Sequence, residues 1–378
     1  MRIAIVGCGF VADNYIDMLA HHPALELTGV YDRDPERLAA FTRFHKLTAY
    51  PSLASLLADD KVGMVVNLTN PASHFDVNMA ALRAGRHVYS EKPLAMTMDE
   101  ARELVETAGH FGLWLAAAPC NHLSDAVETL RREIRSGRLG RIVLAQAEMD
   151  DGMIAMLDYP VWRSRSGAPW PARDEFEVGC TMEHAGYQIT PLVRLFGPVL
   201  RVTAFHACLM PEKGRDIGVR VHSSDLSVGL LEFADGIVAR LSNSILAPAN
   251  RQLRVIGLHG VATLADVWEY HAPVRVAATG SGFRQRVVRA IEKRLTRFVP
   301  GLLLGRAARP VAGSRVAKTA GGHRMDFARG IAQLAAQIER GGEARVGPAL
   351  ALHVTEVTLA LQDPAAGGRA VTMSTGLG

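Results

Sequence analysis

A glycine-rich turn near the start of the chain constrains the fold more than any other feature. A short apolar run leads into GCGFVA at residues 7–12, a helical pattern follows, and a second apolar run at residues 25–31 ends at Asp32. Gly7 permits a tight turn, Gly9 lets the backbone approach a pyrophosphate, and the small third position lets the helix pack on a sheet. Free amides at the start of the helix attract phosphate. This order predicts a dinucleotide-binding unit.

The acid that ends the second run indicates which dinucleotide is bound. Asp32 stands twenty residues after Ala12, where a carboxylate hydrogen-bonds the adenosine ribose. It would repel a 2′-phosphate and therefore favours NAD, whereas the neighbouring Arg33 would attract that phosphate or stack on adenine. We expect NAD as the cofactor, with NADP as the alternative.

Strand-like and helical patterns alternate through the rest of the first third. Apolar runs typical of buried strands cover residues 62–68, 86–89 and 113–117, and helical patterns cover residues 72–84 and 97–111. Such alternation predicts an α/β domain with a parallel, doubly wound sheet. Ligands bind beyond the carboxyl ends of the strands in these sheets, so the loops that follow the strands should share one edge with the glycine turn.

One of these loops holds a lysine between a glutamate and a proline. Proline removes an amide donor and biases the preceding Lys92 toward extended geometry. An isolated Glu-Lys-Pro is more often a turn with a solvated lysine. The parallel sheet, however, places this loop and Lys92 on the cofactor side. A desolvated lysine there takes or gives a proton near neutrality and polarises a carbonyl.

The pattern changes after residue 142, and the chain is long enough for two domains. Strand-like runs with few helices between the later ones cover residues 142–148, 199–207, 227–233, 237–244 and 252–257. They predict an α+β domain with a large, mostly antiparallel open sheet. We expect residues 1–120 to bind the dinucleotide and residues 121–378 to bind substrate. The uncovered face of the sheet needs a ligand, a partner subunit or crossing helices to shield it, and a homodimer or homotetramer through the sheet is the expected assembly.

A helix that carries a histidine is predicted over residues 177–196, with a kink at Thr190-Pro191. Apolar side chains share one face of it, and Cys180, His184 and Tyr187 share a narrower one. A histidine outside the apolar stripe is either a surface or interdomain residue or a functional group, and periodicity alone does not decide between these. Glu183 is expected to point about 100° away from His184 along the helix.

Several motifs together resemble the Gfo/Idh/MocA family of oxidoreductases, which includes glucose–fructose oxidoreductase and inositol dehydrogenase. The resemblance covers essentially the whole chain and rests on GCGFVA, on LTNPASH at residues 68–74, on AGRHVYSEKPLA at residues 84–95, on IRSGRLGRI at residues 134–142, and on GCTMEHAGY at residues 179–187 followed by LFG. It implies a Rossmann domain followed by an α+β domain. It also implies hydride transfer between NAD(P) and a carbon of a sugar, sugar acid or nucleotide sugar.

The resemblance implies roles for individual residues. Lys92 would contact the reacting hydroxyl beside the nicotinamide, and His184 matches the acid–base histidine, so these two are the expected catalytic residues. The expected cofactor contacts are Gly7, Gly9, Phe10, Val11, Ala12, Asp32, Arg33, Thr69, Asn70, Pro71, His74, Glu91, Lys92, Pro93 and Asn121. Cys180 stands where the family has an aspartate, which alters the geometry for a polyol and makes an activated or acidic sugar the expected substrate.

The segment between residues 149 and 177 is a long loop rich in Gly, Pro, Trp and Arg, and such loops are often lids or binding loops. Its tryptophans would stack on a sugar or base, and its arginines would bind an anion. Packing within the loop explains the tryptophans equally well. The expected substrate contacts are Lys92, His122, Trp162, Arg163, Arg165, Trp170, Cys180, His184 and Tyr187.

Composition limits the other classes of function. Four widely spaced cysteines without a CxxC pair argue against a disulfide framework or a zinc site, so we expect no metal and a reducing cytoplasm. No signal-peptide pattern or membrane-spanning run is recognised. No basic run is interleaved with aromatics as an RNA-binding sheet requires, so nucleic acid is not an expected partner.

A basic segment stands out, because residues 284–318 hold ten Lys or Arg against the single acid Glu292, in a chain of net charge +4. A helix that ends before Pro300 would carry an apolar face flanked by basic groups, as helices at an anionic membrane interface do. We therefore consider peripheral contact with an anionic membrane through residues 284–304. Packing of the apolar face on the protein's own sheet is the first alternative, and binding of a nucleotide-sugar phosphate is another.

The leading hypothesis is an NAD(P)-dependent sugar oxidoreductase. Two alternatives stay open. One is a glycoside hydrolase that keeps NAD bound and oxidises its substrate transiently. The other is a non-catalytic NAD(P)-binding regulator, against which the presence of both Lys92 and His184 argues.

Overall fold

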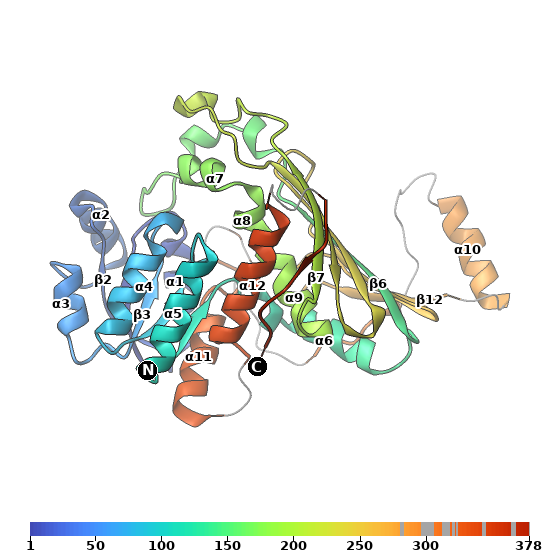
Figure 1. The fold of residues 1–378 in the computed structure, drawn as a ribbon, viewed down its shortest axis with the longest axis horizontal. Coiled ribbons are helices and arrows are strands. Elements are labelled where there is room, and N and C mark those ends of the chain that lie inside the picture. Colours follow the sequence, from blue (N-terminus) through green and yellow to red (C-terminus); the bar gives the residue numbers. More distant parts are fainter. Residues whose placement is uncertain are drawn as a thin grey trace.

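A computed structural model describes residues 1–279, 283–295, 306–311, 318–319, 322, 324–341, 345–363 and 368–377. Two sheets, one of five strands and one of nine, organise these residues. Figure 1 shows the smaller sheet and its helices at one end of the molecule and the larger sheet at the other. The helices α9 (Gly186–Phe196) and α12 (Pro348–Leu361) lie between the two sheets.

The five-stranded sheet is parallel, with its strands in the order β2-β1-β3-β4-β5. The strands are β1 (Arg2–Val6), β2 (Glu26–Tyr31), β3 (Met64–Asn67), β4 (His87–Ser90) and β5 (Leu115–Ala117). The helices are α1 (Ala12–Leu19), α2 (Pro35–His45), α3 (Leu53–Ala58), α4 (His74–Arg83) and α5 (Met98–His110). The expected doubly wound α/β domain is confirmed, while α2 and α3 were not predicted.

Side-chain caps explain where two of these helices begin. Asp34 accepts hydrogen bonds from the amides of Glu36 and Arg37 at the start of α2. Thr97 and Glu100 form a reciprocal capping box at the start of α5. Such caps satisfy amides that have no partner inside the helix and stabilise it by about 1 kcal/mol each. The cap on α5 therefore fixes the far end of the loop that carries Lys92.

The nine-stranded sheet has the order β13-β12-β11-β10-β6-β9-β8-β7-β14, and only the β6–β9 pair within it is parallel. The strands are β6 (Ile142–Asp150), β7 (Arg201–Ala207), β8 (Leu226–Glu232), β9 (Val238–Ser244), β10 (Leu253–Gly257), β11 (Gly260–Leu264), β12 (Val274–Ala278), β13 (Arg306–Ala307) and β14 (Val371–Thr372). One face packs on α6 (Asp125–Arg135), α9 and α12 in a single apolar cluster. The expected mostly antiparallel sheet is confirmed.

The prediction of one helix over residues 177–196 is wrong. α7 (Ala172–Val178) ends at Gly179, and α8 (Cys180–His184) and α9 follow as separate helices. Gly179 has φ +90°, and a Cβ there would lie 3.0 Å from that of Ser223, so only glycine suits this turn. The break gives α7 its own direction, which brings Glu175 toward His184.

One helix near the end of the chain, α11 (Arg329–Arg340), returns to the first domain. It places Ile331 and Leu334 in the same buried cluster as Ile3 and Tyr89 of the five-stranded sheet. The boundary at residue 120 stays a prediction. It does not account for α11, which follows residue 120 in the sequence but packs on the five-stranded sheet.

α10 (Phe283–Leu295) lies beyond β12 and away from the helices that cover the large sheet (Figure 1). Val287, Ile291 and Leu295 recur on it at one-turn spacing and are 42%, 45% and 38% exposed. Packing on the protein's own sheet therefore does not cover these three side chains. Membrane contact stays a prediction, and Pro300 with residues 302–304 lies outside the described residues. Within the described ranges, no helix is long and apolar enough to cross a bilayer.

Candidate active site

The turn between β1 and α1 has the space that a pyrophosphate needs. Gly7 has φ +102°, and a Cβ there would lie 2.6 Å from the carbonyl carbon of Leu68, so the turn requires glycine. At Gly9 no atom lies within 4 Å of the Cβ position, which leaves the backbone open to a ligand. α1 starts directly after this opening and offers its first amides to a phosphate.

Asp32 lies at the end of β2 beside the same turn. Its Oδ2 accepts a hydrogen bond from the amide of Cys8 at 2.8 Å, and its Oδ1 accepts one from the amide of Asp34 at 2.9 Å. Arg37 approaches Oδ2 to 3.7 Å, while Arg33 is exposed. The sequence had not singled out Arg37. The open turn, the helix start and the fixed carboxylate together fit a bound NAD.

Two predicted cofactor contacts are used inside the protein. The ring nitrogens of the buried His74 lie 2.6 Å from the carbonyl oxygen of Pro93 and 2.9 Å from that of Thr69. Asn121 donates from Nδ2 to the carbonyl of Tyr187 at 2.7 Å, and its Oδ1 accepts from a threonine hydroxyl at 2.9 Å. His74 therefore holds together the loops after β3 and β4, and Asn121 holds the start of α9. The contacts expected from Phe10, Val11, Asn70 and Pro71 stay predictions.

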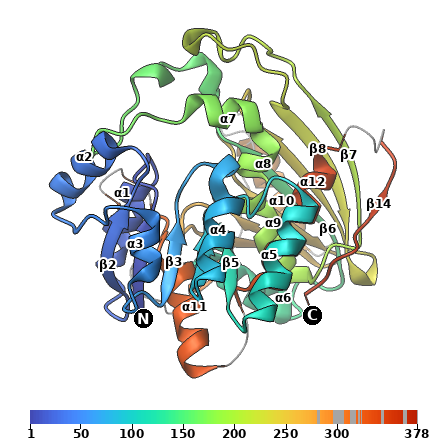
Figure 2. The same cartoon turned by 60° about the vertical axis from the view of Figure 1, so that its left-hand side comes forward.

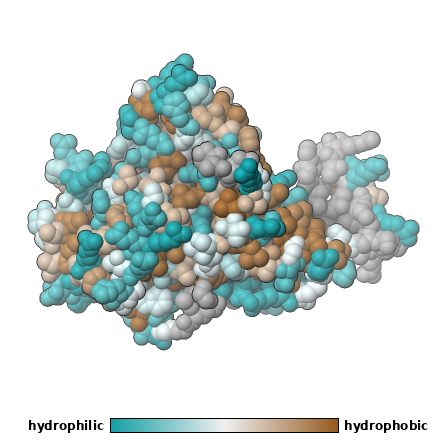
Figure 3. All heavy atoms as spheres, viewed as in Figure 1, coloured by the Kyte–Doolittle hydropathy of each residue, from teal (hydrophilic) through white to brown (hydrophobic). Residues whose placement is uncertain are grey.

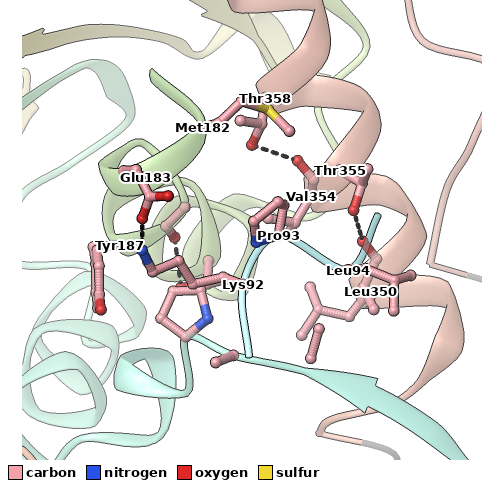
Figure 4. Close-up of a pocket in the computed structure, with 16 residues that line it drawn as sticks. Lys92, Pro93, Leu94, Met182, Glu183, Tyr187, Leu350, Val354, Thr355 and Thr358 are labelled. Carbon is pink, nitrogen blue, oxygen red and sulfur yellow. Dashed lines mark hydrogen bonds and ion pairs between the residues drawn. The ribbon is translucent and has the colours of Figure 1, made fainter. Parts of the chain in front are cut away.

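Lys92 follows β4 at the ligand edge of the parallel sheet, as predicted. Glu91 fixes the backbone there, because it accepts from the hydroxyl of Tyr15 at 2.7 Å and from the amide of Lys92 at 2.9 Å. The Lys92 ammonium points across to α8 and forms an ion pair with Glu183 (Figure 4). The side chains of the pair are 19% and 6% exposed, so both charges are largely removed from water.

The ion pair changes the protonation expected for the lysine. Burial alone would lower the pKa of Lys92, but the carboxylate of Glu183, with smaller contributions from Tyr187 and Glu175, outweighs burial and raises it. The expectation of a lysine that titrates near neutrality is therefore wrong for this state of the site. Lys92 is an ammonium, suited to polarising an oxygen, and Glu183 is the group that keeps it charged.

Tyr187 lies alongside Lys92 (Figure 4). Burial raises the pKa of its hydroxyl, while the charge of Lys92 opposes the rise, so the phenol is neutral at physiological pH. Lys92, Glu183 and Tyr187 also touch a cavity of about 30 Å³, which they share mainly with apolar residues of α12 and of the segment after β5. That volume holds about one water. The cavity is a packing void behind the site and too small for a sugar.

His184 lies on the other side of this group, among carboxylates. Its Nε2 is 3.2 Å from Oε1 of Glu175 and 3.4 Å from Oδ2 of Asp151. Burial, with the charges of Lys92 and Arg251, lowers the pKa of His184 to about 3, so the imidazole is neutral. Burial raises the pKa of Asp151 to about 6 against the opposing charges of Arg251 and Lys92. Burial and the charge of Glu183 raise the pKa of Glu175 well above its usual range.

Four charged residues of the site were not predicted: Asp151, Glu175, Glu183 and Arg251. Arg251 pairs with Asp151 at 3.2 Å and with Asp266 at 3.1 Å, and its guanidinium lies 4.4 Å from the ring centroid of Trp268. A signal existed for Glu183, since it precedes Tyr187 by one helical turn. The other three come from separate segments, and no local pattern joins them.

Four predicted substrate contacts lie elsewhere. Cys180 is buried in an apolar cluster, where burial raises its pKa to about 12. Trp162 and Trp170 pack on each other with centroids 5.2 Å apart and line the same cluster. His122 is buried with Nε2 3.0 Å from the carbonyl of Arg345. Packing and backbone support therefore account for these side chains.

The tip of the loop before α7 crosses to the first domain, as Figure 2 shows. Arg165 forms an ion pair with Asp17 of α1 at 2.6 Å, and Ser166 donates from its amide and hydroxyl to Asp13 of α1, each at 3.0 Å. Arg163 donates to the carbonyls of Pro160 and Trp162 in its own loop. The two arginines therefore do not meet Lys92, and this loop tip clamps the helix that starts at the pyrophosphate turn.

Two family models match the chain. The model described as "Oxidoreductase family, NAD-binding Rossmann fold" matches residues 1–117, and the model described as "GFO/IDH/MocA C-terminal domain" matches residues 127–263. Together they span more than half of the 378 residues and include strands of both sheets.

Individual proteins resemble the chain at lower identity. Trans-1,2-dihydrobenzene-1,2-diol dehydrogenase of Mus musculus is 25% identical over 286 residues, which cover 74% of this chain and 78% of the relative. 1,5-anhydro-D-fructose reductase of Ensifer adhaerens is 31% identical over 148 residues, which cover 38% of this chain and 44% of the relative. An oxidoreductase from Agrobacterium radiobacter, solved in complex with NAD+, L-tartaric acid and magnesium, superposes with a TM-score of 0.75 at 19% identity and 98% coverage of both chains. That likeness supports the fold alone.

Proposed function

Since the chain belongs to the Gfo/Idh/MocA family of NAD-binding oxidoreductases, we propose that it transfers a hydride between NAD and a CH–OH or keto carbon of a sugar. One observation carries the proposal. The buried ammonium of Lys92 stands at the ligand edge of the dinucleotide-binding sheet, and Glu183 of the second domain holds it there. The names of the dehydrogenase and reductase relatives support a carbon that alternates between hydroxyl and carbonyl.

NAD, when bound, supplies or accepts the hydride. The residues of the chain transfer the proton and orient the substrate. Lys92 holds the substrate oxygen through a charge-assisted hydrogen bond. In oxidation the C–H hydrogen leaves the substrate carbon with its electron pair. The hydroxyl proton passes to Nζ of Lys92, and Nζ at the same time gives one of its own protons to Oε2 of Glu183. Reduction runs the same transfers backwards. A positioned acid–base group of this kind contributes roughly a hundred- to ten-thousand-fold in rate.

Tyr187 and His184 take supporting positions in this proposal. The neutral hydroxyl of Tyr187 lies beside Lys92 and donates a second hydrogen bond to the substrate oxygen. His184 is neutral and faces Glu175 and Asp151, which suits it to orient the substrate's other hydroxyls. The acid–base role expected for His184 stays a prediction.

Formation of NADH with a panel of sugars, sugar acids and nucleotide sugars tests the proposal. We expect at least one sugar to reduce NAD, and Lys92→Ala to lower turnover by about two decades or more while NAD affinity stays nearly unchanged, the pattern of a lost transition-state contact. A panel without any reduction of NAD, or a Lys92→Ala protein with normal turnover, would contradict it.

The clamp on α1 favours one alternative. Arg165 and Ser166 close over the helix that starts at the pyrophosphate turn, which would slow release of the dinucleotide. A retained cofactor suits a glycoside hydrolase that oxidises and then re-reduces its substrate within one turnover. NAD that copurifies with the protein, together with glycoside cleavage and no net NADH, would favour this alternative.

Self-association through the large sheet is a further part of the proposal. On the face away from α9, the register aligns one row of partly buried apolar side chains across five strands: Val238, Leu144, Ile256, Val261 and Ala277. Figure 3 shows apolar side chains gathered over this part of the molecule, beside α10. Sedimentation that shows a monomer at micromolar concentration would contradict a dimer through this row.

A further inference from the structure

The helix that starts at the pyrophosphate turn carries a buried tyrosine that the proposed proton transfer does not use. Tyr15 lies in the first turn of α1, and its side chain is buried. Its ring belongs to the apolar cluster behind the five-stranded sheet and packs on Phe327, with ring centroids 5.5 Å apart. Phenylalanine would fill this space equally well, so the hydroxyl of Tyr15 needs an explanation of its own.

That hydroxyl donates to the residue that precedes Lys92. Its partner is Oε1 of Glu91 at 2.7 Å, and Oε2 of the same buried carboxylate accepts from the amide of Lys92 at 2.9 Å. Burial and the charge of Glu91 raise the pKa of Tyr15 well above its ordinary value, so the hydroxyl keeps its proton and donates it to the bond. One carboxylate therefore joins α1 to the backbone of Lys92.

The other side of α1 is held by the second domain. Asp13 and Asp17 bind the loop tip that clamps this helix. They are one turn apart, and Tyr15 lies about 200° around the helix from each of them. One short helix thus connects three parts of the site: the pyrophosphate turn at its start, the loop tip on one side, and the carboxylate of Glu91 on the other.

Two carboxylates fix the lysine at its two ends. Glu183 pairs with the ammonium of Lys92, and Glu91 holds its amide. Without the hydroxyl of Tyr15, Oε1 of Glu91 would lose its donor, and a buried carboxylate reorients toward the donors that remain. Such a shift would release the amide of Lys92 and displace its side chain. A displacement of about 1 Å at a reacting group lowers the rate by up to about a hundredfold.

We infer that Tyr15 is a positioning residue that ties the helix at the pyrophosphate turn, through Glu91, to the backbone of Lys92. The inference rests on the proposed role of Lys92 in hydride transfer. A dinucleotide at the turn and the closed loop tip both restrain α1, and this restraint reaches Lys92 through two hydrogen bonds. The lysine is therefore held most firmly when the pyrophosphate turn is filled.

Exchange of the Lys92 amide tests this link without any substrate. Hydrogen–deuterium exchange is followed by mass spectrometry on a peptide that contains Lys92, with and without NAD. In the natural protein we expect NAD to slow the exchange. Tyr15→Phe should speed the exchange about tenfold, as the loss of a hydrogen bond to a charged group does, and should remove the effect of NAD.

Tyr270→Phe is the matched control. Tyr270 is also buried, and its hydroxyl lies 3.3 Å from Sγ of Cys120, so the change removes a buried tyrosine hydroxyl that does not reach Glu91. It should leave the exchange of the Lys92 peptide unchanged. Exchange that stays the same in Tyr15→Phe, or that rises equally in Tyr270→Phe, would overturn the inference.

Single-turnover kinetics with the best sugar of the panel give the second readout. Tyr15→Phe should lower the rate of NAD reduction about ten- to a hundredfold while the Kd for NAD stays within about twofold. The same change made in a Glu91→Ala protein should have no further effect, because its hydrogen-bond partner is already gone. Equal losses in both backgrounds would overturn the inference. Exchange that depends on NAD and on Tyr15, without turnover of any sugar, would uphold the link to Lys92 and reject the proposed oxidation.

Discussion

Replacing Glu183 by glutamine is the most informative single change, because it removes the charge but keeps the size of the side chain. In the folded protein the pKa of Lys92 is raised above its ordinary 10.5, since Glu183 outweighs burial. The pair therefore stabilises the fold fully below about pH 10.5, and this contribution is lost as the pH rises through the folded pKa. Without the carboxylate, burial is opposed only by the smaller contributions of Tyr187, Glu175 and Glu91, so we expect the pKa of Lys92 to fall below 10.5.

The expected loss of stability follows from the burial of the pair. Removing one partner of a buried ion pair costs about 3–5 kcal/mol, because an uncompensated charge is left behind. The Lys92 side chain is 19% exposed and keeps some contact with water, so we expect the free energy of unfolding to fall by about 3 kcal/mol. In the variant the unfolded chain binds more protons than the folded one between the lowered folded pKa of Lys92 and 10.5, so its stability rises with pH across that interval. The difference in unfolding free energy between the variant and the natural protein should be largest near neutrality and should narrow toward pH 10.5.

Urea unfolding across this pH range measures this difference, with the pH profile of kcat/KM as the second readout. Turnover near neutrality should fall by about two decades or more, as for the loss of a transition-state contact. Glu177→Gln serves as the control, since Glu177 lies on α7, is 48% exposed and pairs with Arg173, and it should change neither quantity. Equal unfolding free energies for the natural protein and Glu183→Gln at all pH values, with an unshifted rate profile, would refute the assignment of Glu183.

Three other predictions concern the cofactor and the surface. Asp32→Ala should weaken NAD more than NADP, because it removes a bond to the ribose hydroxyl and a repulsion from the 2′-phosphate; a natural protein that already prefers NADP in titrations would contradict this. Arg165→Ala should speed NADH release about two- to fivefold in stopped-flow fluorescence, since its partly exposed pair is worth under about 1 kcal/mol; an unchanged rate would remove the clamp from the account. Vesicle flotation at low salt should show binding to anionic lipid that falls when Arg286→Gln and Arg294→Gln are combined, at about 1 kcal/mol per basic group. Absence of flotation with the natural protein would leave α10 a structural element.

The sequence predicted the dinucleotide half of the site well, because its signals are local. Gly7, Gly9 and Asp32 belong to one strand–turn–helix–strand unit. Gly7 permits the positive φ of the turn, Gly9 leaves the backbone open to a ligand, and Asp32 accepts a hydrogen bond from the amide of Cys8. Lys92 was placed correctly on the ligand edge, since the carboxyl ends of parallel strands meet there. Its protonation was misjudged, because the partner that sets it comes from a distant helix.

The substrate half could not be predicted in the same way. Asp151, Glu175 and Arg251 lie on separate segments, and only the folded second domain brings them to His184 and to one another. Helical periodicity also gave a wrong prediction of one helix over residues 177–196, because the periodic pattern continues across Gly179, where the chain turns with φ +90°. For the tryptophans of the long loop the sequence left stacking on a sugar and packing within the loop equally open, and in the structure Trp162 and Trp170 pack on each other.

Transfer of deuterium tests the central claim most directly. The best substrate of the sugar panel, deuterated at its carbons, is incubated with NAD, and the reduced nicotinamide is examined by NMR. The account predicts that deuterium from the oxidised carbon appears at C4 of the nicotinamide with the natural protein, and that Lys92→Met lowers the rate of its appearance by about two decades or more. Reduced nicotinamide without deuterium, or equal rates of transfer in the two proteins, would contradict hydride transfer at a site governed by Lys92.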